Sequence, residues 1–441
     1  MNATQLRSVD YWGDIPENWQ FIPIKYGFNL IGSGTTPPTG QEEYFGGSVP
    51  WVTTSELREN FITSTTQTVS ELAIAEFSAL KIFPENTVLI AMYGATIGRV
   101  AILGIPACVN QAVCALAQPI CFEPRYVSYT LQASRDYLLS LASGGGQPNL
   151  NAEKIKSHYI PCPSLSKQRA IANYLDHETA KIDTLISAKE HLLDLLTEKR
   201  QSLITNVITC GLNPDIPMRD SGVEWIGHIP KHWNIKRIKF LIHGIDTGFS
   251  PQCYNFPAQE GEWGVLKTGC VNGGIFNPQE NKTLPPEIEI PLEIEVKKDD
   301  ILMSRASGST DLIGSVALVE NQPNERLLLS DKIFRLRLNT EICDANFFVI
   351  TMGSLIIRQQ ILQFVSGAEG LANNITQSDI RELLIPIPPI EEQIKIVSFI
   401  KEKISTIDTL SQVALKTINY LQERRTALIT AAVTGQIKVA A

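Results

Sequence analysis

The chain contains one structural plan twice, and this internal repeat limits the possible folds more than any other feature of the sequence. The first copy opens with Trp12-Gly-Asp-Ile-Pro-Glu-Asn-Trp19, and the second opens with Gly227-His-Ile-Pro-Lys-His-Trp233. At one constant separation the copies share Gly13 and Gly227, Pro16 and Pro230, Trp19 and Trp233, Lys25 and Lys239, Gly34 and Gly248, and Pro37 and Pro251. A repeat on this scale indicates two units of equivalent fold.

The copies match again toward their ends at a slightly larger separation, so the second copy has gained residues in between. The matching pairs are Ile155 and Ile380, Ile160 and Ile385, Pro161 and Pro386, Pro163 and Pro388, Gln168 and Gln393, Asp183 and Asp408, and Leu185 and Leu410. Glu198, Arg200, Leu203, Ile204 and Thr205 then match Glu423, Arg425, Leu428, Ile429 and Thr430. The front parts differ most, which indicates that loops and recognition surfaces lie there.

Each copy has a front part rich in Gly, Pro and β-branched residues, then a short strand flanked by prolines, and then a helical run. Strand patterns occur at residues 87–93 and 99–103 in the first copy and at 300–303 and 315–319 in the second. Helical patterns follow at residues 125–141 and 345–364. Prolines restrict the strands at 158–163 and 383–388 to a sheet edge or a strand end. We therefore predict a mixed α/β domain in each copy.

Two stretches, residues 166–209 and 390–433, contain no proline or glycine and have apolar residues at helical spacing. A helix of about 40 residues is roughly 60 Å long, longer than either front domain can bury. Its apolar stripe therefore needs a partner, and we predict that the two helices form a coiled coil, antiparallel if a pseudo-twofold axis relates the copies. Two ordinary core helices are the alternative.

This organisation predicts two pseudo-repeated α/β domains that are separated by the two long helices. The segments are residues 1–165 for the first domain, 166–210 for a central helical spacer, 211–389 for a linker with the second domain, and 390–441 for a C-terminal helical spacer and tail. A chain of 441 residues is also longer than one hydrophobic core usually supports.

Composition argues against a membrane span and against a metal site. The longest apolar stretch, residues 88–109, is interrupted by Gly94, Gly98, Arg99, Gly104 and Pro106, and the N-terminal residues lack the pattern of a secretory signal. We expect a soluble, cytoplasmic protein. The eight cysteines have irregular spacing, which favours free thiols, and the Ile-Pro between His228 and His232 argues against a helix that presents both imidazoles.

The marks of catalysis are missing. No Gly-Lys dipeptide of a phosphate-binding loop occurs, and Gly144-Gly-Gly146 lacks the strand and helix of a dinucleotide site. The Asn-Pro-Pro-aromatic signature of adenine methyltransferases is absent, as is a GxSxG elbow. Glu295 and Lys297 faintly resemble a nuclease pair, but their acidic surroundings favour a strand and turn.

The chain resembles the specificity subunits of type I restriction–modification systems in three features. These are the repeated plan, the two G-x-I-P-x-x-W openings, and the two Ile-Pro-x-Pro strands, which precede helices that start with Lys167-Gln-Arg169 and Glu391-Glu-Gln393. The linker at residues 211–225 is also similar to the hinge of that family. The resemblance covers nearly the whole chain. Each motif alone is of modest specificity, whereas their duplicated order is highly specific.

The resemblance implies a non-catalytic protein in which two target-recognition domains each read half of a bipartite, asymmetric sequence in double-stranded DNA. It implies that the helices set the gap between the half-sites and bind two methyltransferase subunits, with restriction and translocase subunits joining through them. It implies no cofactor in this chain, with S-adenosylmethionine, ATP and Mg in partner subunits. The net charge of −8 is unusual for a DNA-binding protein, so a local basic face or basic partner surfaces are needed.

Reading DNA requires hydrogen-bonding groups on loops that reach a groove. In the first domain the candidates are Thr53, Thr54, Ser55, Tyr93, Thr96, Arg99, Gln147, Asn149 and Asn151. In the second they are Lys267, Thr268, Arg305, Ser307, Ser309, Asn373 and Asn374. All of these residue types are also common in turns that have no ligand. The densest basic cluster is Lys231, Lys236, Arg237 and Lys239, which fits either a phosphate track or a solvated strand.

For subunit docking, the candidate residues of the long helices are Leu175, Ile182, Leu196, Arg200, Ile400, Ile407, Leu421 and Arg425. Two functions from other classes stay open on the sequence alone. A dimeric protein–protein scaffold without DNA binding agrees with the net acidity, and a stand-alone enzyme is the third possibility. Salt-dependent DNA binding separates the scaffold from the DNA reader, and activity of the isolated chain identifies the enzyme.

Overall fold

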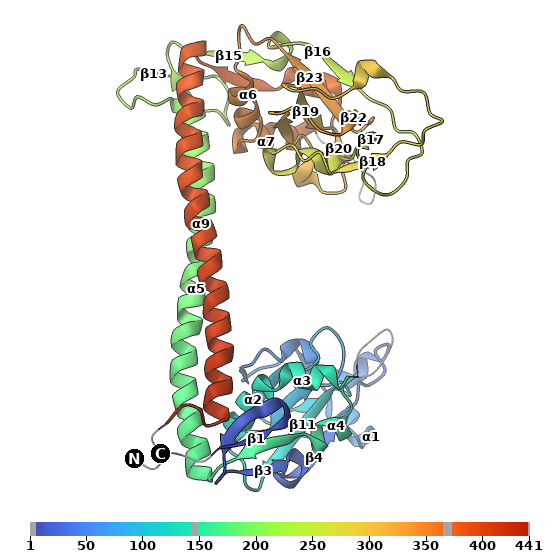
Figure 1. Cartoon of the computed structure of the whole chain (residues 1–441), viewed down its shortest axis with the longest axis vertical. Helices are drawn as coiled ribbons and strands as arrows, with labels where there is room; N and C mark the ends of the chain where they lie inside the picture. The colour runs from blue at the N-terminus through green and yellow to red at the C-terminus, as the bar shows by residue number, and fades with distance from the viewer. Residues whose placement is uncertain (1–5, 143–148, 365–372, 440–441) are drawn as a thin grey trace. The chain divides into compact units, whose positions relative to one another are not determined.

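The computed structural model describes residues 6–142, 149–364 and 373–439, and it divides into two compact units. Unit 1 contains Met1–Glu190 and Leu415–Ala441, and unit 2 contains His191–Ala414 (Figure 1). The division falls within both long helices, α5 (Leu165–Cys210) and α9 (Ile390–Val433). Each unit therefore combines one α/β domain with part of each helix.

The α/β domain of unit 1 is built on a five-stranded sheet of order β4-β11-β8-β9-β6. The strands are β4 (Phe28–Ser33), β6 (Phe61–Ile62), β8 (Val88–Ala91), β9 (Val100–Leu103) and β11 (Val113–Pro119). A three-stranded sheet, β10-β5-β7, lies beside it, with β5 (Phe45–Val52), β7 (Gln67–Val69) and β10 (Cys108–Val109). Neighbouring strands are antiparallel except for the pairs β6–β9 and β5–β10.

The central strands of this domain are apolar throughout because both faces of the sheet are covered. On one face Val88 and Ile90 pack with Tyr126 and Val127 of α2 (Pro124–Ala133). On the other face Leu89 packs with a separate cluster around Val52 and Leu57. The remaining helices are α1 (Glu71–Glu76), α3 (Arg135–Ser140) and α4 (Ala152–Ser157).

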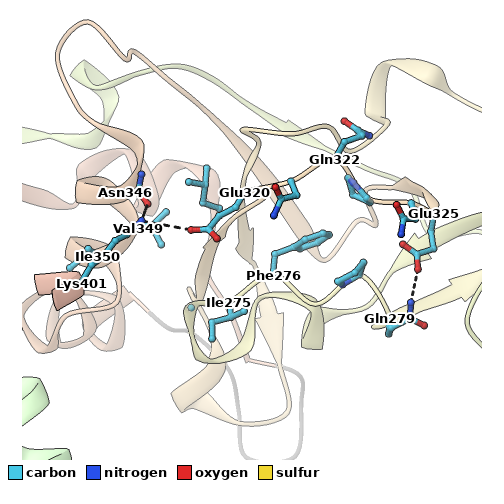
Figure 2. Close-up of a pocket in the computed structure, with 16 residues that line it drawn as sticks. Ile275, Phe276, Gln279, Glu320, Gln322, Glu325, Asn346, Val349, Ile350 and Lys401 are labelled. Carbon is cyan, nitrogen blue, oxygen red and sulfur yellow. Dashed lines mark hydrogen bonds and ion pairs between the residues drawn. The ribbon is translucent and has the colours of Figure 1, made fainter. Parts of the chain in front are cut away.

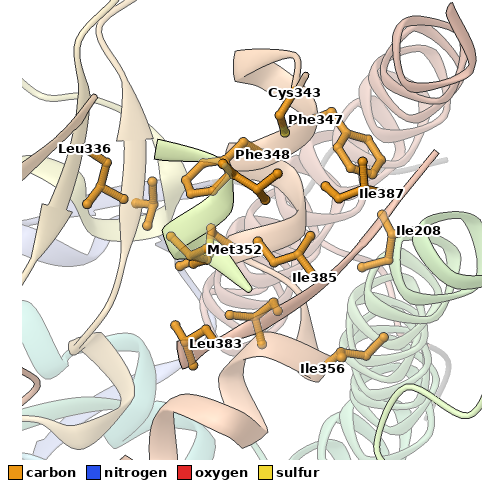
Figure 3. Close-up of a cluster of buried hydrophobic side chains, with 14 of the residues drawn as sticks. Ile208, Leu336, Cys343, Phe347, Phe348, Met352, Ile356, Leu383, Ile385 and Ile387 are labelled. Atoms are coloured by element: carbon orange, nitrogen blue, oxygen red, sulfur yellow. The ribbon is translucent and has the colours of Figure 1, made fainter. Parts of the chain in front are cut away.

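Unit 2 repeats this plan with four strands in the main sheet, in the order β16-β23-β19-β21. They are β16 (Ile242–Thr247), β19 (Ile301–Ser304), β21 (Val316–Leu318) and β23 (Ile333–Leu338), and the smaller sheets contain β17 (Trp263–Leu266), β18 (Asn281–Thr283), β20 (Ala306–Ser307), β22 (Arg326–Leu328) and β24 (Asn373–Asn374). The helices are α6 (Ala345–Met352), α7 (Leu355–Phe364) and α8 (Gln377–Glu382). Figure 3 shows how Phe347, Phe348 and Met352 of α6 fill the core between the sheet and the long helices.

The expected helices at residues 125–141 and 345–364 are each divided in two. The first breaks at Ser134, whose hydroxyl donates to the Thr130 carbonyl at 3.0 Å. The second breaks at Gly353 and Ser354, and the Ser354 hydroxyl donates to the Thr351 carbonyl at 2.6 Å. In both copies a serine hydroxyl thus donates a hydrogen bond to a helix carbonyl at the break. Such a bond competes with the backbone hydrogen bonds of the helix, and the spacing of apolar residues does not reveal it.

The shared opening motif and the proline-flanked strand form a second duplicated unit. In unit 1, β3 (Gln20–Pro23) pairs with β12 (Tyr159–Cys162), and in unit 2, β15 (Asn234–Arg237) pairs with β25 (Leu384–Ile387). Each pair is an isolated two-stranded sheet, as the prolines predict. β1 (Leu6–Val9) pairs with β2 (Gly13–Pro16), and β13 (Met218–Asp220) pairs with β14 (His228–Pro230).

The tryptophan of each opening motif packs against the end of a long helix. Trp19 belongs to the same core cluster as Ala432 and Val433 at the end of α9. Trp233 belongs to a cluster with Val207 and Ile208 at the end of α5. The helix of one copy therefore ends on the opening motif of the other copy, which explains why the motif occurs twice.

The two long helices form an antiparallel coiled coil, as the repeat predicts. In unit 1 the Arg425 Nε donates to Asp183 at 2.9 Å, and in unit 2 the Arg200 Nη1 donates to Asp408 at 2.8 Å. The residue numbers increase along α5 from Asp183 to Arg200, whereas the numbers of their partners on α9 decrease from Arg425 to Asp408, as antiparallel helices require. Because Asp183 matches Asp408 and Arg200 matches Arg425 in the repeat, the two ion pairs are the same interaction with the roles of the helices exchanged.

No single helix among residues 6–142, 149–364 and 373–439 has the length and hydropathy of a membrane span. One bent pair, α6 with α7, passes by length and composition alone, with a bend of 64°. Phe347, Phe348, Ile356 and Ile357 of this pair are buried in the core of unit 2.

A buried glutamine at the start of each long helix ties three segments together. Gln168 Nε2 donates to the carbonyls of Cys121 and Pro163 at 3.0 and 2.9 Å, and its Oε1 accepts from the Glu123 amide at 2.9 Å. Gln393 makes the same three bonds to Ile342, Pro388 and Asp344 at 3.1, 2.9 and 2.8 Å.

We predict that Gln168→Leu lowers the free energy of unfolding by about 2 to 4 kcal/mol, because it leaves three buried backbone groups without partners. Gln393→Leu has the same effect in unit 2. The exposed Gln201→Leu on α5 is the matched control and changes the value by less than about 0.5 kcal/mol. Chemical denaturation of the full chain measures all three, and equal midpoints for Gln168→Leu and the control would contradict this account.

Candidate nucleic-acid interface

In unit 1 the candidate loops converge on one end of the five-stranded sheet. β11 is antiparallel to both β4 and β8, and β9 is also antiparallel to β8. Strands β4 and β8 therefore end at this end of the sheet, and β9 and β11 begin there. The Asn110 amide donates to the Val52 carbonyl at 3.0 Å, and the Leu150 amide donates to the Met92 carbonyl at 2.7 Å. These contacts bring together residues 34–36, 53–55, 92–99, 110–112 and 149–151, which we call the first loop cluster.

Unit 2 gathers equivalent loops at the matching end of its main sheet. The Arg305 amide donates to the Lys332 carbonyl at 2.8 Å, and the Ile375 amide donates to the Arg305 carbonyl at 3.0 Å. Lys267 follows β17, whose parallel partner β22 leads into residues 330–332. The second loop cluster thus consists of residues 248–250, 267–268, 305–315, 330–332 and 373–375.

The first loop cluster contains the candidate residues of its domain that the structure describes, but their side chains differ in what they can offer a ligand. Ser55 and Asn149 are exposed. The Thr53 hydroxyl takes part in a capping box with Glu56, and the Asn151 side chain caps α4 by accepting from the Lys154 amide at 2.9 Å. The Thr96 hydroxyl is buried. Thr54 is half-buried, and Gln147 lies outside the described residues.

In the second loop cluster the candidates pair across two short strands. Ser307 faces Asn373, and Ala306 faces Asn374, in the antiparallel pair β20–β24. The equivalent contact in unit 1 is the antiparallel bridge between Tyr93 and Asn149. The Ser307 hydroxyl accepts from the Ser309 amide at 3.2 Å, which fixes the turn that follows.

Three ionisable side chains at or near the loop clusters, those of Arg305, Tyr93 and Glu59, are influenced by neighbouring groups of the protein. The Arg305 guanidinium lies 5.7 Å from the Phe334 ring centroid, and its Nη1 reaches the Asp331 carbonyl at 3.5 Å. Burial raises the pKa of Tyr93, so its phenol stays a neutral hydrogen-bond donor. Burial also raises the pKa of Glu59, although Arg99, Arg135 and Arg425 nearby oppose that shift.

Two of the four cations in the basic cluster of the second opening motif share one carboxylate. Arg237 and Lys239 both contact the Glu382 carboxylate, at 3.0 and 2.8 Å, and this bonding lowers the pKa of Glu382. Lys231 remains exposed, and Lys236 is half-buried. The cluster is thus a strand face bound to α8 rather than a continuous track of free cations.

Unit 2 also has a cavity of about 650 Å³ between its α/β domain and the start of α9. Figure 2 shows Lys401 of α9 reaching Asn346 at 2.7 Å and Glu320 at 3.8 Å on one side, and Gln279 contacting Glu325 at 2.5 Å on the other. Among the residues that the structure describes, no histidine, cysteine, serine or threonine lines this cavity. The side chains of Lys401, Asn346 and Glu320, and of Gln279 and Glu325, pair with one another and do not form a nucleophile and base.

The residues that suggested other chemistry have structural partners. His232 Nε2 lies 2.9 Å from the Glu392 carboxylate, which also accepts from the Trp233 indole at 3.1 Å. Glu295 and Lys297 form an ion pair at 3.7 Å. The eight cysteines are free thiols. Within the described ranges, no three His, Cys, Asp or Glu side chains are placed to share a metal ion.

On the long helices, most of the candidate docking residues line the seam inside the chain. Leu175, Ile182, Leu196, Ile400 and Ile407 are buried, and Arg200 and Arg425 form the two interhelical ion pairs. Leu421 is half-buried. The exposed apolar residues lie on other faces, and the repeat matches Leu185 with Leu410 and Leu195 with Tyr420. These exposed side chains, rather than the seam, are free to contact another subunit.

Comparison with known proteins gives a family match over most of the chain. The family model described as the type I restriction modification DNA specificity domain matches residues 16–193 and 273–419. The chain belongs to this specificity family. The two matched segments contain the two loop clusters almost entirely, apart from residues 248–250 and 267–268.

Several curated specificity subunits of type I restriction enzymes are similar to the chain. The EcoEI subunit of Escherichia coli is 33% identical over 41% of this chain and 30% of its own length, and the MjaIX subunit of Methanocaldococcus jannaschii is 30% identical over 56% and 57%. These matches span less than two thirds of either relative. The EcoKI subunit of E. coli K12 is 23% identical over 91% of this chain and 85% of its own length.

Two solved structures have the same fold as this chain. A chain from a study of complex assembly and conformational transition of the type I R-M system has a TM-score of 0.71 at 15% identity, covering 96% of this chain and 99% of that one. The HsdS subunit of Thermoanaerobacter tengcongensis has a TM-score of 0.52 at 15% identity, covering 96% and 98%.

The structure adds residues to the loop clusters that sequence reasoning missed. The Thr36 hydroxyl donates to Gln111, and the Ser250 hydroxyl donates to Asp331, so the same cross-loop bond occurs in both domains. Arg58 and Lys332 are exposed beside these loops. The available signal was the repeat itself, because Gly34 and Gly248 match in sequence immediately before the two loops that make these bonds.

The match between Gly34 and Gly248 has a steric cause. A Cβ atom on Gly34 would lie 1.6 Å from the Val109 carbonyl oxygen, and one on Gly248 would lie 1.9 Å from the Leu329 carbonyl oxygen. In both domains the loop after the first strand of the main sheet must therefore pass directly against the backbone of the loop beside it.

We predict that Gly34→Ala and Gly248→Ala each destabilise their unit by about 3 kcal/mol, because overlap with backbone cannot be relieved by a side-chain rotation. Gly40→Ala and Gly308→Ala, where an added Cβ has nothing within 4 Å, are the matched controls and change stability little. Thermal unfolding of the full chain provides the comparison. Variants of Gly34 and Gly40 that unfold at the same temperature would show that the close approach is wrong.

Proposed function

We propose that the chain is the DNA-recognition subunit of a type I restriction–modification complex. Each α/β domain reads one half of a bipartite, asymmetric site in double-stranded DNA through its loop cluster. The observation that supports this most strongly is the duplication of the loop cluster at the same end of both sheets, in a chain of the DNA specificity family. The scaffold alternative has no comparable support.

The differences between the two loop clusters support an asymmetric site. Residues 92–99 and 305–315 occupy equivalent positions, but the second segment is longer and contains the short elements β20 and η8 (Thr310–Leu312). Exposed groups also differ, with Ser55 and Asn149 in the first cluster and Lys332 in the second. Different hydrogen-bonding groups in the grooves read different base pairs.

The chain acts without catalysis of its own in this proposal. Methyltransferase subunits carry S-adenosylmethionine, and restriction and translocase subunits supply the chemistry that uses ATP and Mg. The partner surfaces also help to explain how a chain with a net charge of −8 binds DNA, because phosphate contacts can come from the assembled complex.

Two methyltransferase subunits dock on exposed apolar residues of the long helices. In unit 1, Leu185 of α5 and Tyr420 of α9 are exposed, and in unit 2 the repeat places the exposed Leu410 and Leu195 at the equivalent positions. Exposed aliphatic and aromatic side chains in a row are typical of protein interaction sites. Because these positions are equivalent in the repeat, the proposal gives two sites of the same kind.

The recognition proposal predicts a bipartite methylated motif in cells that express the chain with its methyltransferase. A chimera that replaces residues 1–165 with those of another family member changes one half of the motif and leaves the other half unchanged. Sequencing that detects methylated adenines measures both. Absence of a motif in the presence of a stable complex would contradict DNA reading, and a change in both halves would contradict one domain for each half-site.

The docking proposal predicts a stepwise loss of bound subunits. Leu185→Glu with Tyr420→Glu weakens one methyltransferase site by about 100-fold, and Leu410→Glu with Leu195→Glu weakens the other, because each pair places charge in an apolar contact. Gln201→Glu on an exposed part of α5 is the control. Native mass spectrometry should show two subunits, then one, then none when all four changes combine. Retention of two subunits by the fourfold variant would exclude this surface.

A further inference from the structure

Both α/β domains place an arginine from a short helix beneath the same turn of the loop cluster. In unit 1, Arg135 is the first residue of α3, and its Nη2 donates to the Ile97 carbonyl at 3.4 Å. In unit 2, Arg358 of α7 donates through Nη1 to the Ile313 carbonyl and through Nη2 to the Thr310 carbonyl. Ile97 and Ile313 occupy equivalent positions, so this contact is present twice.

The turns that receive these arginines close in the same way although their lengths differ. In unit 1 the Gly98 amide donates to Ala91 at 2.8 Å, and the Ala91 amide donates to Arg99 at 2.9 Å. In unit 2 the Gly314 amide donates to Ser304 at 2.8 Å, and the Ser304 amide donates to Ser315 at 2.8 Å. The divergent segment is therefore the part between the strand end and this shared closure.

Each arginine is half-buried. The Nε atoms of Arg135 and Arg358 are both buried, and neither has a hydrogen-bond partner among the residues that the structure describes. Glu59 lies within electrostatic range of Arg135, and Asp311 within that of Arg358. A buried Nε atom without a partner costs free energy, so its presence at the same place in both domains needs a compensating role.

The contacts also argue against direct DNA binding by these two side chains. The guanidinium of each donates inward to carbonyls of its own turn, and its Nε is closed to solvent. At Gly98 an added Cβ would lie 3.2 Å from Arg135 Cγ, so the turn packs directly on the stem of the arginine. The exposed residues of the turn, rather than the arginine, face a ligand.

We propose that Arg135 and Arg358 are positioning residues that hold the base-reading turn of each domain in the shape that discriminates its half-site. This inference rests on the proposed function, which assigns residues 92–99 and 305–315 to DNA reading. Ordering a turn before binding removes an entropic cost and fixes its donors relative to the bases. Each arginine therefore affects specificity for one half-site only.

The first test is amide hydrogen exchange on the full chain, which needs neither DNA nor a partner. Arg135→Met speeds exchange at residues 97–99 by about tenfold or more, because a charge-assisted hydrogen bond is lost, and it leaves residues 312–315 unchanged. Arg358→Met has the reverse effect. Arg169→Met is the control, since that exposed side chain pairs with Glu123 away from the turn. If Arg358→Met does not fold, Arg358→Lys replaces it, because lysine keeps the charge without the two-carbonyl fork.

The second test measures discrimination in the complex with the methyltransferase. Methylation rates are compared between the mapped motif and variants with one substituted base pair in either half-site. Arg135→Met lowers discrimination about tenfold in the half-site read by the first domain, Arg358→Met does so in the other, and the lysine variants recover part of it. A merely structural defect would instead lower the rate on all sites equally.

The outcomes separate this inference from the proposed function. Unchanged exchange in the turns overturns the anchoring role, whatever the complex does with DNA. Faster exchange with unchanged discrimination overturns the role in specificity. A wild-type complex that methylates no bipartite motif overturns the proposed function and, with it, the role of the two arginines in specificity. The hydrogen-exchange result still shows whether the arginines anchor the turns.

Discussion

The apolar seam between α5 and α9 is the interaction on which the rest of the molecule depends. Neither α/β domain can bury a helix of this length, so each helix uses the other, and Ile182, Leu196, Ile407 and Ala414 are buried as a result. A seam of this kind tolerates sliding unless polar contacts fix it. The reciprocal ion pairs, Asp183 with Arg425 and Asp408 with Arg200, define one register within each unit. Each helix also ends against the opening tryptophan of the other copy, so α9 ends on Trp19 in unit 1 and α5 ends on Trp233 in unit 2.

The duplication separates residues that maintain the fold from residues that are free to read DNA. Interactions present in both copies are structural, and they include the buried Gln168 and Gln393 and the close loop approach at Gly34 and Gly248. The loop clusters are one place where the copies differ, since β20 and η8 occur between two strands of unit 2. Arg135 and Arg358 lie at the boundary, since they are shared side chains that hold divergent turns. This arrangement allows target sequences to change without a change in the scaffold.

The sequence predicted the long-range plan better than the individual contacts. Long helices without proline or glycine and an internal repeat are global signals, so the antiparallel coiled coil and both α/β domains followed from them. The side chains of the site depend on local competition that periodicity does not show. Thr53 and Asn151 have the chemistry of DNA contacts, yet they cap helices, and Leu175 and Ile400 face the seam rather than a partner. Thr36 and Gln111 meet only because two loops far apart in sequence share a sheet end.

The central claim is that two loop clusters of one chain contact two separate segments of DNA. Hydroxyl-radical and methylation-protection footprinting of the assembled methyltransferase complex on a fragment that carries its mapped motif tests this claim most directly. The account predicts two protected segments with base contacts, separated by an unprotected stretch, and the loss of one segment alone when its domain is exchanged. One continuous protected block, or protection of a single segment by the wild-type complex, would contradict it.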